Sequence, residues 1–144
     1  LKLYGNTDPD QAASRLGVLP LNLEGISHFK AAAILGYEFG IGVRSGCFCA
    51  HPYILHLLGL SAEEARRVRD RMLSGDKRAM PGLVRASFGL YNSKEEIDRF
   101  VEALQCIQRG EYAGDYVQAR ASGEYRLKDW TADFEPVFSI KSPA

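Results

Sequence analysis

The chain has 144 residues and a formal net charge of zero, with 18 basic and 18 acidic residues mixed along its length. This length suits one globular domain with a real core, and the balanced charge provides no basic patch for nucleic acid or an anionic membrane. No apolar run is long enough to span a bilayer and no charged-then-apolar leader opens the chain, so we expect a cytoplasmic protein with no nucleic-acid or membrane partner.

Two further features of the totals bear on the kind of protein. Three cysteines are an odd and small number, which argues against a disulfide framework and for reduced thiols. The chain opens at Leu1, without a methionine and directly in an apparent strand. We therefore expect a fragment of a larger protein.

The first part of the chain predicts two strands and a helix. Residues 1–4 form a short strand-like run that ends in turn residues, and residues 16–23 form a second run in which Pro20 indicates an edge or irregular strand. Ser27 then caps a predicted helix that ends at Gly40. The predicted apolar face of this helix consists of Phe29, Ala32, Ala33 and Gly36.

The stretch from residue 42 to residue 52 holds two of the three cysteines between a predicted strand at 41–43 and a predicted helix at 52–58. Cys49 comes just before this helix, where unpaired backbone amides and the positive end of the helix dipole favour an anion. Arg44, five residues earlier, adds positive charge. Cys49 is therefore a candidate nucleophile. The alternative is a pair of ordinary intracellular cysteines, one buried and one exposed.

The next segment predicts a helix and then an informative strand. Residues 61–73 open with a capping box, and their arginines alternate with acids, which favours a solvated face over an anion site. In the strand predicted at 83–91, alternation places Arg85 on the face opposite to the apolar residues Val84, Ala86 and Phe88. A guanidinium on a rigid strand, flanked by small residues, suits bidentate capture of a carboxylate or phosphate. The alternative is an arginine that faces solvent or pairs with a structural acid.

The last regular element is a helix that a capping box at Ser93 begins and Gly110 ends. Cys106 falls on its polar side, away from the periodic apolar residues. From Glu111 onward the aromatic residues follow no sustained period. We therefore expect residues 1–110 to form the domain and residues 111–144 to form an extension that packs on it.

Three groups of residues now stand in order: the run 40–46 (Gly-Ile-Gly-Val-Arg-Ser-Gly), then Cys49 and Ala50 with Pro52, then the run 84–88 (Val-Arg-Ala-Ser-Phe) with Tyr91 and Asn92. In these the chain resembles the C-terminal small domain of class V aminotransferase-type enzymes, which depend on pyridoxal 5'-phosphate. The similarity runs from about residue 16 to residue 107, and the branch it resembles is that of the cysteine desulfurases and selenocysteine lyases.

The fold we expect is α+β: a two-layer sandwich of a small, mostly antiparallel sheet with helices on one face. The other face would turn toward the large domain that this chain lacks, and would expose apolar surface in isolation. The resemblance implies that a lysine of that large domain holds the pyridoxal 5'-phosphate. The fragment alone is therefore expected to be inactive.

The resemblance also implies roles for individual residues. Arg85 matches the arginine that holds the α-carboxylate of the amino-acid substrate, and Arg44 matches a loop arginine near the substrate. Cys49 matches the cysteine that attacks the sulfur of bound L-cysteine, which leaves alanine and a persulfide. The implied partners are the amino-acid substrate, the missing large domain, a second copy in a homodimer and a sulfur-acceptor protein.

The chain also departs from the family pattern. Related desulfurases usually carry two histidines where this chain has Cys47 and Phe48, so the proton handling of those histidines is not inherited. His51 is a candidate auxiliary residue in their place, and Cys47 is a candidate alternative nucleophile or a trap for sulfur on Cys49. Ser27 to Lys30 resembles the cofactor-lysine motif only superficially, because His28 is not adjacent to the lysine.

Two other functions remain open from the sequence. One is a class V enzyme without sulfur chemistry, which would use Arg85 but not Cys49. The other is a metal-binding module in which Cys47, Cys49 and His51 are soft ligands, although a convincing fourth ligand is lacking.

Overall fold

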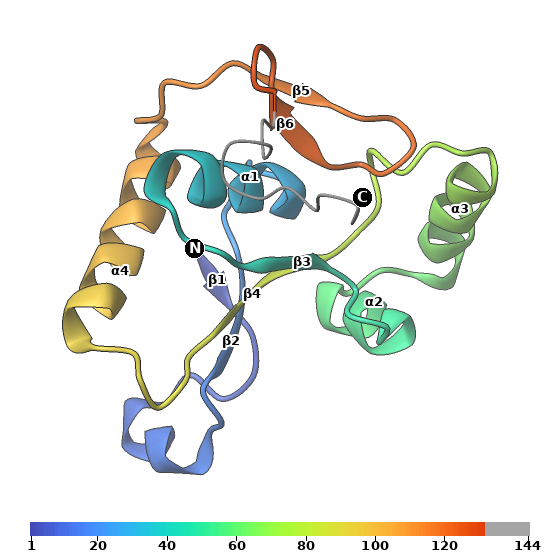
Figure 1. The fold of residues 1–144 in the computed structure, drawn as a ribbon. Coiled ribbons are helices and arrows are strands. Elements are labelled where there is room, and N and C mark those ends of the chain that lie inside the picture. Colours follow the sequence, from blue (N-terminus) through green and yellow to red (C-terminus); the bar gives the residue numbers. More distant parts are fainter. Residues whose placement is uncertain (132–144) are drawn as a thin grey trace, which may run out of the picture.

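The computed structural model describes residues 1–131, so the part of the expected extension at 132–144 lies outside the described residues. The main sheet has four strands: β1 (Lys2–Leu3), β2 (Val18–Asn22), β3 (Arg44–Gly46) and β4 (Leu83–Ser87). Their order is β1-β2-β4-β3, and every neighbouring pair is antiparallel. The helices are η1 (Pro9–Ser14, a 3-10 helix), α1 (His28–Phe39), α2 (His51–Leu58), α3 (Ala62–Leu73) and α4 (Lys94–Arg109) (Figure 1).

The main core lies between one face of this sheet and the helices α1 and α4. Its buried residues are Leu21, Leu23, Ala31, Ile34, Leu35, Val84, Ala86, Phe100, Ala103, Leu104 and Ile107. Burying a large aliphatic or aromatic side chain contributes roughly 1.5–3 kcal/mol, so this layer is the main source of stability. The chain is therefore the expected α+β sandwich, with two helices packed on one face of an antiparallel sheet.

The opposite face of the sheet carries a smaller cluster at one end, where α2 packs. This cluster consists of Tyr4, Cys47, Ile54 and Leu83. Because side chains alternate along β4, Leu83 and Arg85 share this second face while Val84 and Ala86 point into the main core. The alternation predicted for this strand is confirmed.

The start of β3 and the buried side of α1 differ from the sequence predictions. The strand begins at Arg44 and not at Ile41, so this arginine belongs to the sheet itself. In α1, Ala32 and Ala33 are only half-buried and Gly36 is exposed, whereas Ile34 and Leu35 are fully buried. The larger side chains occupy the core because they bury more apolar area.

Pro20 lies in an interior strand, contrary to the prediction of an edge or irregular strand. Its carbonyl accepts a hydrogen bond from the Tyr4 amide at 3.0 Å. The amide and carbonyl of one residue in an antiparallel strand point to the same side, so the missing N–H also faces the first strand. Pro20 cannot donate a ladder hydrogen bond to that strand. The strand accordingly ends at Leu3, which pairs with Leu21, the residue after Pro20.

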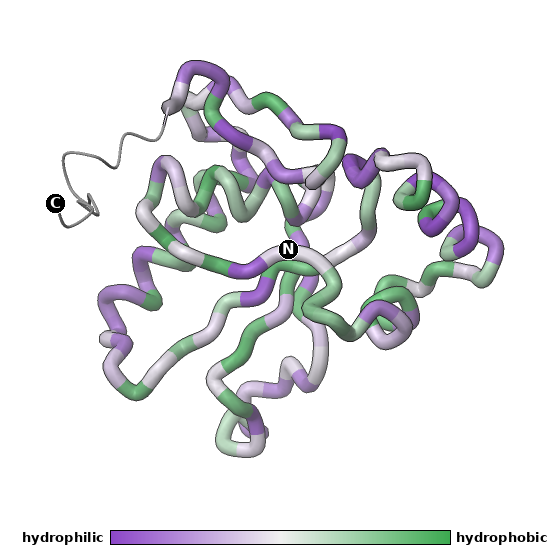
Figure 2. The backbone as a smooth tube through the Cα atoms, turned by 45° about the vertical axis from the view of Figure 1, so that its right-hand side comes forward, coloured by the Kyte–Doolittle hydropathy of each residue, from purple (hydrophilic) through white to green (hydrophobic). Residues whose placement is uncertain are grey.

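The helix ends follow the predicted capping residues. Ser61 and Ser93 both form complete capping boxes, at α3 and α4. The glycines that end α1, α2 and α4 all adopt left-handed φ values, of 66°, 72° and 75°. None of the residues of α3 is buried, and Figure 2 shows this helix as mainly hydrophilic. Among residues 1–131, no helix combines the length and apolar character needed to cross a membrane.

A second, two-stranded sheet was not expected from the sequence. Its strands, β5 (Tyr116–Gln118) and β6 (Tyr125–Leu127), form an antiparallel hairpin beside α1. Glu38 of α1 ties the start of the hairpin down, because its carboxylate accepts hydrogen bonds from the Ala113 and Gly114 amides and from the Tyr116 hydroxyl. These three bonds measure 2.9, 3.1 and 2.7 Å.

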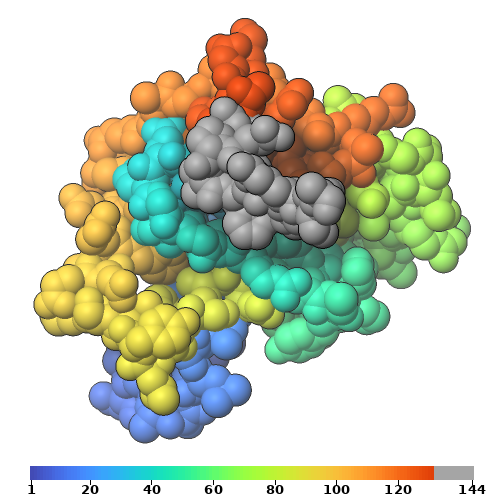
Figure 3. All heavy atoms as spheres, viewed as in Figure 1, coloured from blue at the N-terminus to red at the C-terminus, as the bar shows by residue number. Residues whose placement is uncertain are grey.

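At the end of the sheet near η1, two distant segments lie side by side (Figure 3). The Phe88 amide donates to the Gly17 carbonyl at 2.6 Å. A Cβ atom on Gly17 would lie 2.6 Å from the Phe88 carbonyl oxygen, so only glycine permits this approach. The contact brings the segments before β2 and after β4 together.

Candidate functional site

The loop that joins β3 to α2 has an unusual backbone. Phe48 and Cys49 are the two non-glycine residues with positive φ in the described chain, at 53° and 61°. Such conformations are uncommon for residues with a Cβ, and each costs on the order of 1–3 kcal/mol. A 2.7 Å hydrogen bond from the Ala50 amide to the Cys47 carbonyl closes the turn. Strain of this kind persists only where surrounding contacts hold it, and it is concentrated at functional sites.

Cys49 lies at the exposed part of this turn, before Ala50, the N-cap residue of α2. No side chain caps the first amides of the helix. The thiol is therefore open to an approaching molecule, in the place where the sequence predicts a nucleophile.

Cys47 is in a different environment, although only one residue separates it from Cys49. It is 4% exposed, and its Sγ lies 3.1 Å from the Pro81 carbonyl oxygen, to which the thiol donates. Burial raises the pKa of the Cys47 thiol. A buried, protonated thiol that already has a hydrogen-bond partner is a poor nucleophile, so the geometry favours a structural role for Cys47.

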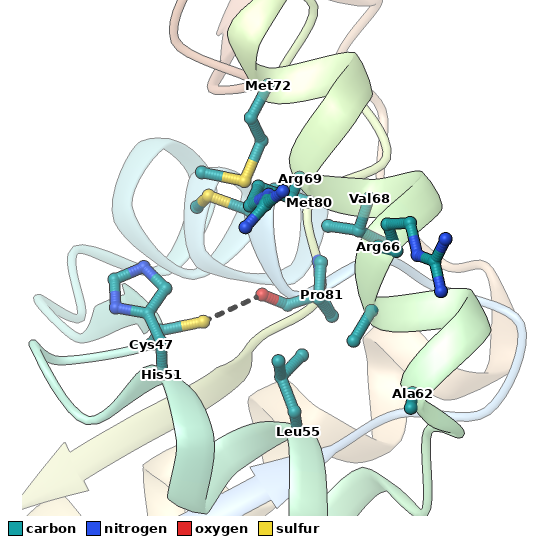
Figure 4. Close-up of a pocket in the computed structure, with 11 residues that line it drawn as sticks. Cys47, His51, Leu55, Ala62, Arg66, Val68, Arg69, Met72, Met80 and Pro81 are labelled. Carbon is teal, nitrogen blue, oxygen red and sulfur yellow. Dashed lines mark hydrogen bonds between the residues drawn. The ribbon is translucent and has the colours of Figure 1, made fainter.

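His51 shares a cavity with Cys47, and Arg85 does not line this cavity. Both side chains line a cavity of about 550 Å³ between α2, α3 and the segment before β4. Its other walls include Leu55, Val68, Met72 and Met80, as Figure 4 shows. Neither Cys49 nor Arg85 lines it.

Arg85 projects from the centre of the sheet without an acidic partner. It is half-buried on β4, and its Nε is buried with no hydrogen-bond partner among the described residues. Its cross-strand neighbours are Pro20 on one side and Arg44 on the other. A buried guanidinium donor without a partner costs free energy unless an anion pairs with it. The interpretation of Arg85 as paired with a structural acid is thus wrong within residues 1–131.

Arg44 lies directly opposite Arg85 in the register of β3 and β4. It is exposed, and none of the ion pairs between described residues includes either arginine. Like charges at opposed positions destabilise a sheet. Arg44 and Arg85 together form a positive site on the second face of the sheet, and this site is suited to a small anion.

Phe48 connects this positive site to the cysteine loop, a role that the residue pattern did not predict. The Arg85 guanidinium carbon lies 5.0 Å from the centre of the Phe48 ring, within the range of a cation–π contact. Because Phe48 directly precedes Cys49, the structure links the predicted nucleophile and the predicted carboxylate-binding arginine through one residue. The sequence did contain a signal for this role, because Phe48 stands where related desulfurases usually carry a histidine.

The proposed metal cluster does not form. In residues 1–131, no three His, Cys, Asp or Glu side chains are grouped so that they could hold a metal ion. Cys47 faces the cavity and the Pro81 carbonyl while Cys49 is exposed. This geometry does not support the metal-binding alternative.

The segment that resembles the cofactor-lysine motif is structural. The Lys30 ammonium sits 4.9 Å from the centre of the Tyr112 ring, and buried His28 donates from Nε2 to the Met80 carbonyl at 2.9 Å. Burial lowers the pKa of His28, and the bond to Met80 raises it in part. Lys30 and His28 are thus engaged within the domain, and this segment does not serve as the cofactor-lysine motif.

Comparisons with known proteins identify the family of this chain. The family model described as aminotransferase class-V matches residues 1–100. A protein named cysteine desulfurase from Escherichia coli O127:H6 is 32% identical over 109 residues, which cover 76% of this chain and 20% of that protein. A probable cysteine desulfurase from Vibrio cholerae is 34% identical over 87 residues, 60% of this chain and 16% of the relative.

A solved structure gives the same result. The apo structure of cysteine desulfurase from Thermococcus onnurineus NA1 matches with a TM-score of 0.54 and 30% sequence identity, over 76% of this chain and 21% of that one. The chain thus spans about a fifth of the length of the relatives it matches. It belongs to the class-V aminotransferase family, and within that family it is similar to cysteine desulfurases.

Proposed function

We propose that this chain is the substrate-facing small domain of a cysteine desulfurase-like enzyme that depends on pyridoxal 5'-phosphate. The observation that carries the proposal is the arginine without an acidic partner at position 85, which Phe48 connects to an exposed cysteine in a strained loop. A cysteine desulfurase, as the relatives are named, would need both a carboxylate-binding group and a sulfur-accepting thiol. The activity of the whole protein is our proposal.

In this function, Arg85 binds the substrate α-carboxylate. Its planar fork can donate two parallel hydrogen bonds to one carboxylate, which sets the orientation as well as the affinity. Arg44, opposite it, adds positive charge and holds the anion in place.

Cys49 takes the sulfur. A thiolate at Cys49 forms an S–S bond to the sulfur of L-cysteine while the substrate C–S bond breaks. The net change converts L-cysteine and the Cys49 thiolate into L-alanine and a Cys49 persulfide anion, with the substrate thiol hydrogen accounted for in the alanine methyl group. The cofactor, held outside this chain, supplies the electron sink. An exposed Cys49 also remains within reach of a sulfur-acceptor protein.

Replacement of Cys49 in the full-length enzyme tests the proposal. Cys49→Ala should abolish sulfide release from L-cysteine in the presence of a reductant, whereas the matched Cys106→Ala, on α4, should leave it unchanged. Undiminished sulfide release by Cys49→Ala would refute the desulfurase function. If the enzyme then moved or eliminated amino groups with Arg85 still required, the class V alternative without sulfur chemistry would take its place.

A further inference from the structure

We propose that Phe48 is a positioning residue: its ring orients the Arg85 guanidinium and couples it to the cysteine loop, so that the carboxylate-binding fork and the Cys49 sulfur are held as one unit. This inference rests on the proposed function, which it deepens. The centre of the Phe48 ring lies 5.0 Å from the guanidinium carbon of Arg85.

The Phe48 ring and a bound carboxylate use different parts of the Arg85 guanidinium. A guanidinium that stacks on an aromatic ring uses its planar face, and its N–H donors then point outward in the plane. A carboxylate binds along that edge, through two parallel hydrogen bonds. The ring of Phe48 can therefore hold Arg85 without occupying the edge that a substrate needs.

A neutral aromatic ring suits Arg85 better than an acidic partner would. An acidic partner would occupy the fork and compete with the substrate, and no acid pairs with Arg85 in residues 1–131. Arg44, directly opposite, repels a second positive charge and favours side-chain conformations that lead away from it. A neutral ring attracts the guanidinium and leaves its hydrogen-bonding capacity free.

The backbone of the turn at Phe48 and Cys49 is itself strained. Phe48 and Cys49 keep left-handed backbones, which a bulky residue such as phenylalanine rarely adopts. Two hydrogen bonds help to hold this turn, from the Cys47 thiol to the Pro81 carbonyl and from the Ala50 amide to the Cys47 carbonyl. Phe48 itself packs against the smaller apolar cluster as well as against Arg85. Loss of the ring contact therefore disturbs both the arginine and the nucleophile that follows Phe48.

The first test uses this chain alone, with no substrate. NMR of the Arg85 Nε–H, assigned with Arg85→Lys, reports the ring directly, because a proton over an aromatic face is shifted upfield. Phe48→Leu should remove the shift and Phe48→Tyr should keep it. The matched control is Phe88→Leu, which loses an aromatic contact with Phe100 on the other face and should leave the Arg85 signal in place. An Arg85 signal that does not move in Phe48→Leu overturns the proposal.

The second test uses the full-length holoenzyme. Phe48→Leu should raise KM for the amino-acid substrate about 2- to 30-fold, the range expected for loss of one cation–π contact, and Phe48→Tyr should restore it. A Phe48→Tyr enzyme as impaired as Phe48→Leu would overturn the proposal, since a ring would then not be what matters. The two proposals can fail independently. If Cys49→Ala refuted the desulfurase function, the NMR shift and the KM for an α-amino acid would still test the role of Phe48.

Discussion

Arg44 on β3 and Arg85 on β4 occupy directly opposed positions of neighbouring antiparallel strands, and no ion pair within residues 1–131 includes either side chain. This arrangement opposes folding, since like charges across a strand pair repel. An anionic substrate bound between the two arginines would offset this repulsion. Without substrate, the repulsion should lower the stability of the chain.

Arg44→Gln should stabilise the isolated chain while it weakens carboxylate binding in the full enzyme. Removing one of two opposed charges relieves roughly 0.2–1 kcal/mol of repulsion, and the gain should shrink at high salt because ions screen it. Urea unfolding at low and high salt measures the effect. Arg126→Gln is the control, as an exposed strand arginine outside the described ion pairs. A destabilised Arg44→Gln chain would show that the arginine holds the fold together.

The three thiols should react with iodoacetamide in an order set by their exposure. Cys49 is exposed, Cys106 is intermediate and Cys47 is buried with its thiol donating to a carbonyl. Mass spectrometry of the folded chain should therefore find Cys49 modified first and Cys47 modified only when the chain is unfolded. Modification of native Cys47 as fast as that of Cys49 would revive Cys47 as an alternative nucleophile.

The hairpin of β5 and β6 should loosen at acid pH through Glu38. Its slight burial raises the pKa of Glu38, but hydrogen bonds from Ala113, Tyr116 and Gly114 outweigh this and lower it below the ordinary value. The carboxylate therefore stabilises the fold above its ordinary pKa, and this contribution is lost as the pH falls through the lowered value. Burial and the bond to Glu38 raise the pKa of Tyr116, so its hydroxyl remains a donor over this range.

Thermal unfolding of Glu38→Gln against the parent chain isolates this contribution from the capping-box glutamates. The variant should be less stable near neutral pH, and the difference should vanish in acid. Glu102→Gln, an exposed change on α4 away from the hairpin, should show no such pH dependence. A constant difference at every pH would mean that Glu38 acts through packing and not through its charge.

The isolated chain should self-associate through the end of the sheet near η1. Leu16, Leu90 and Tyr91 are 85%, 108% and 88% exposed, and the Gly17–Phe88 hydrogen bond brings their segments together. Exposed apolar surface of this kind favours association. Sedimentation should show concentration-dependent association that Leu16→Lys with Leu90→Lys reduces. Leu73→Lys, at the end of α3, is the control, and a monomer at high concentration would contradict the expectation.

Local residue patterns were sufficient to predict most elements of this fold. Helix ends were predictable because their signals involve only a few neighbouring residues. These signals are the capping boxes at Ser61 and Ser93 and the glycines that follow three of the helices. The alternation in β4 placed Arg85 opposite the core for the same reason. The hairpin of β5 and β6 escaped prediction because two strands of three residues are too short to show a period.

What the sequence by itself determined was the family motifs, the order of the elements and the residue types available for chemistry. The tertiary structure decided which of them meet. Strand register paired Arg44 with Arg85, the turn placed the Phe48 ring on the guanidinium, and packing buried Cys47 while it left Cys49 exposed. These relationships join residues from separate elements, and their geometry depends on packing across the whole domain, which no local pattern encodes.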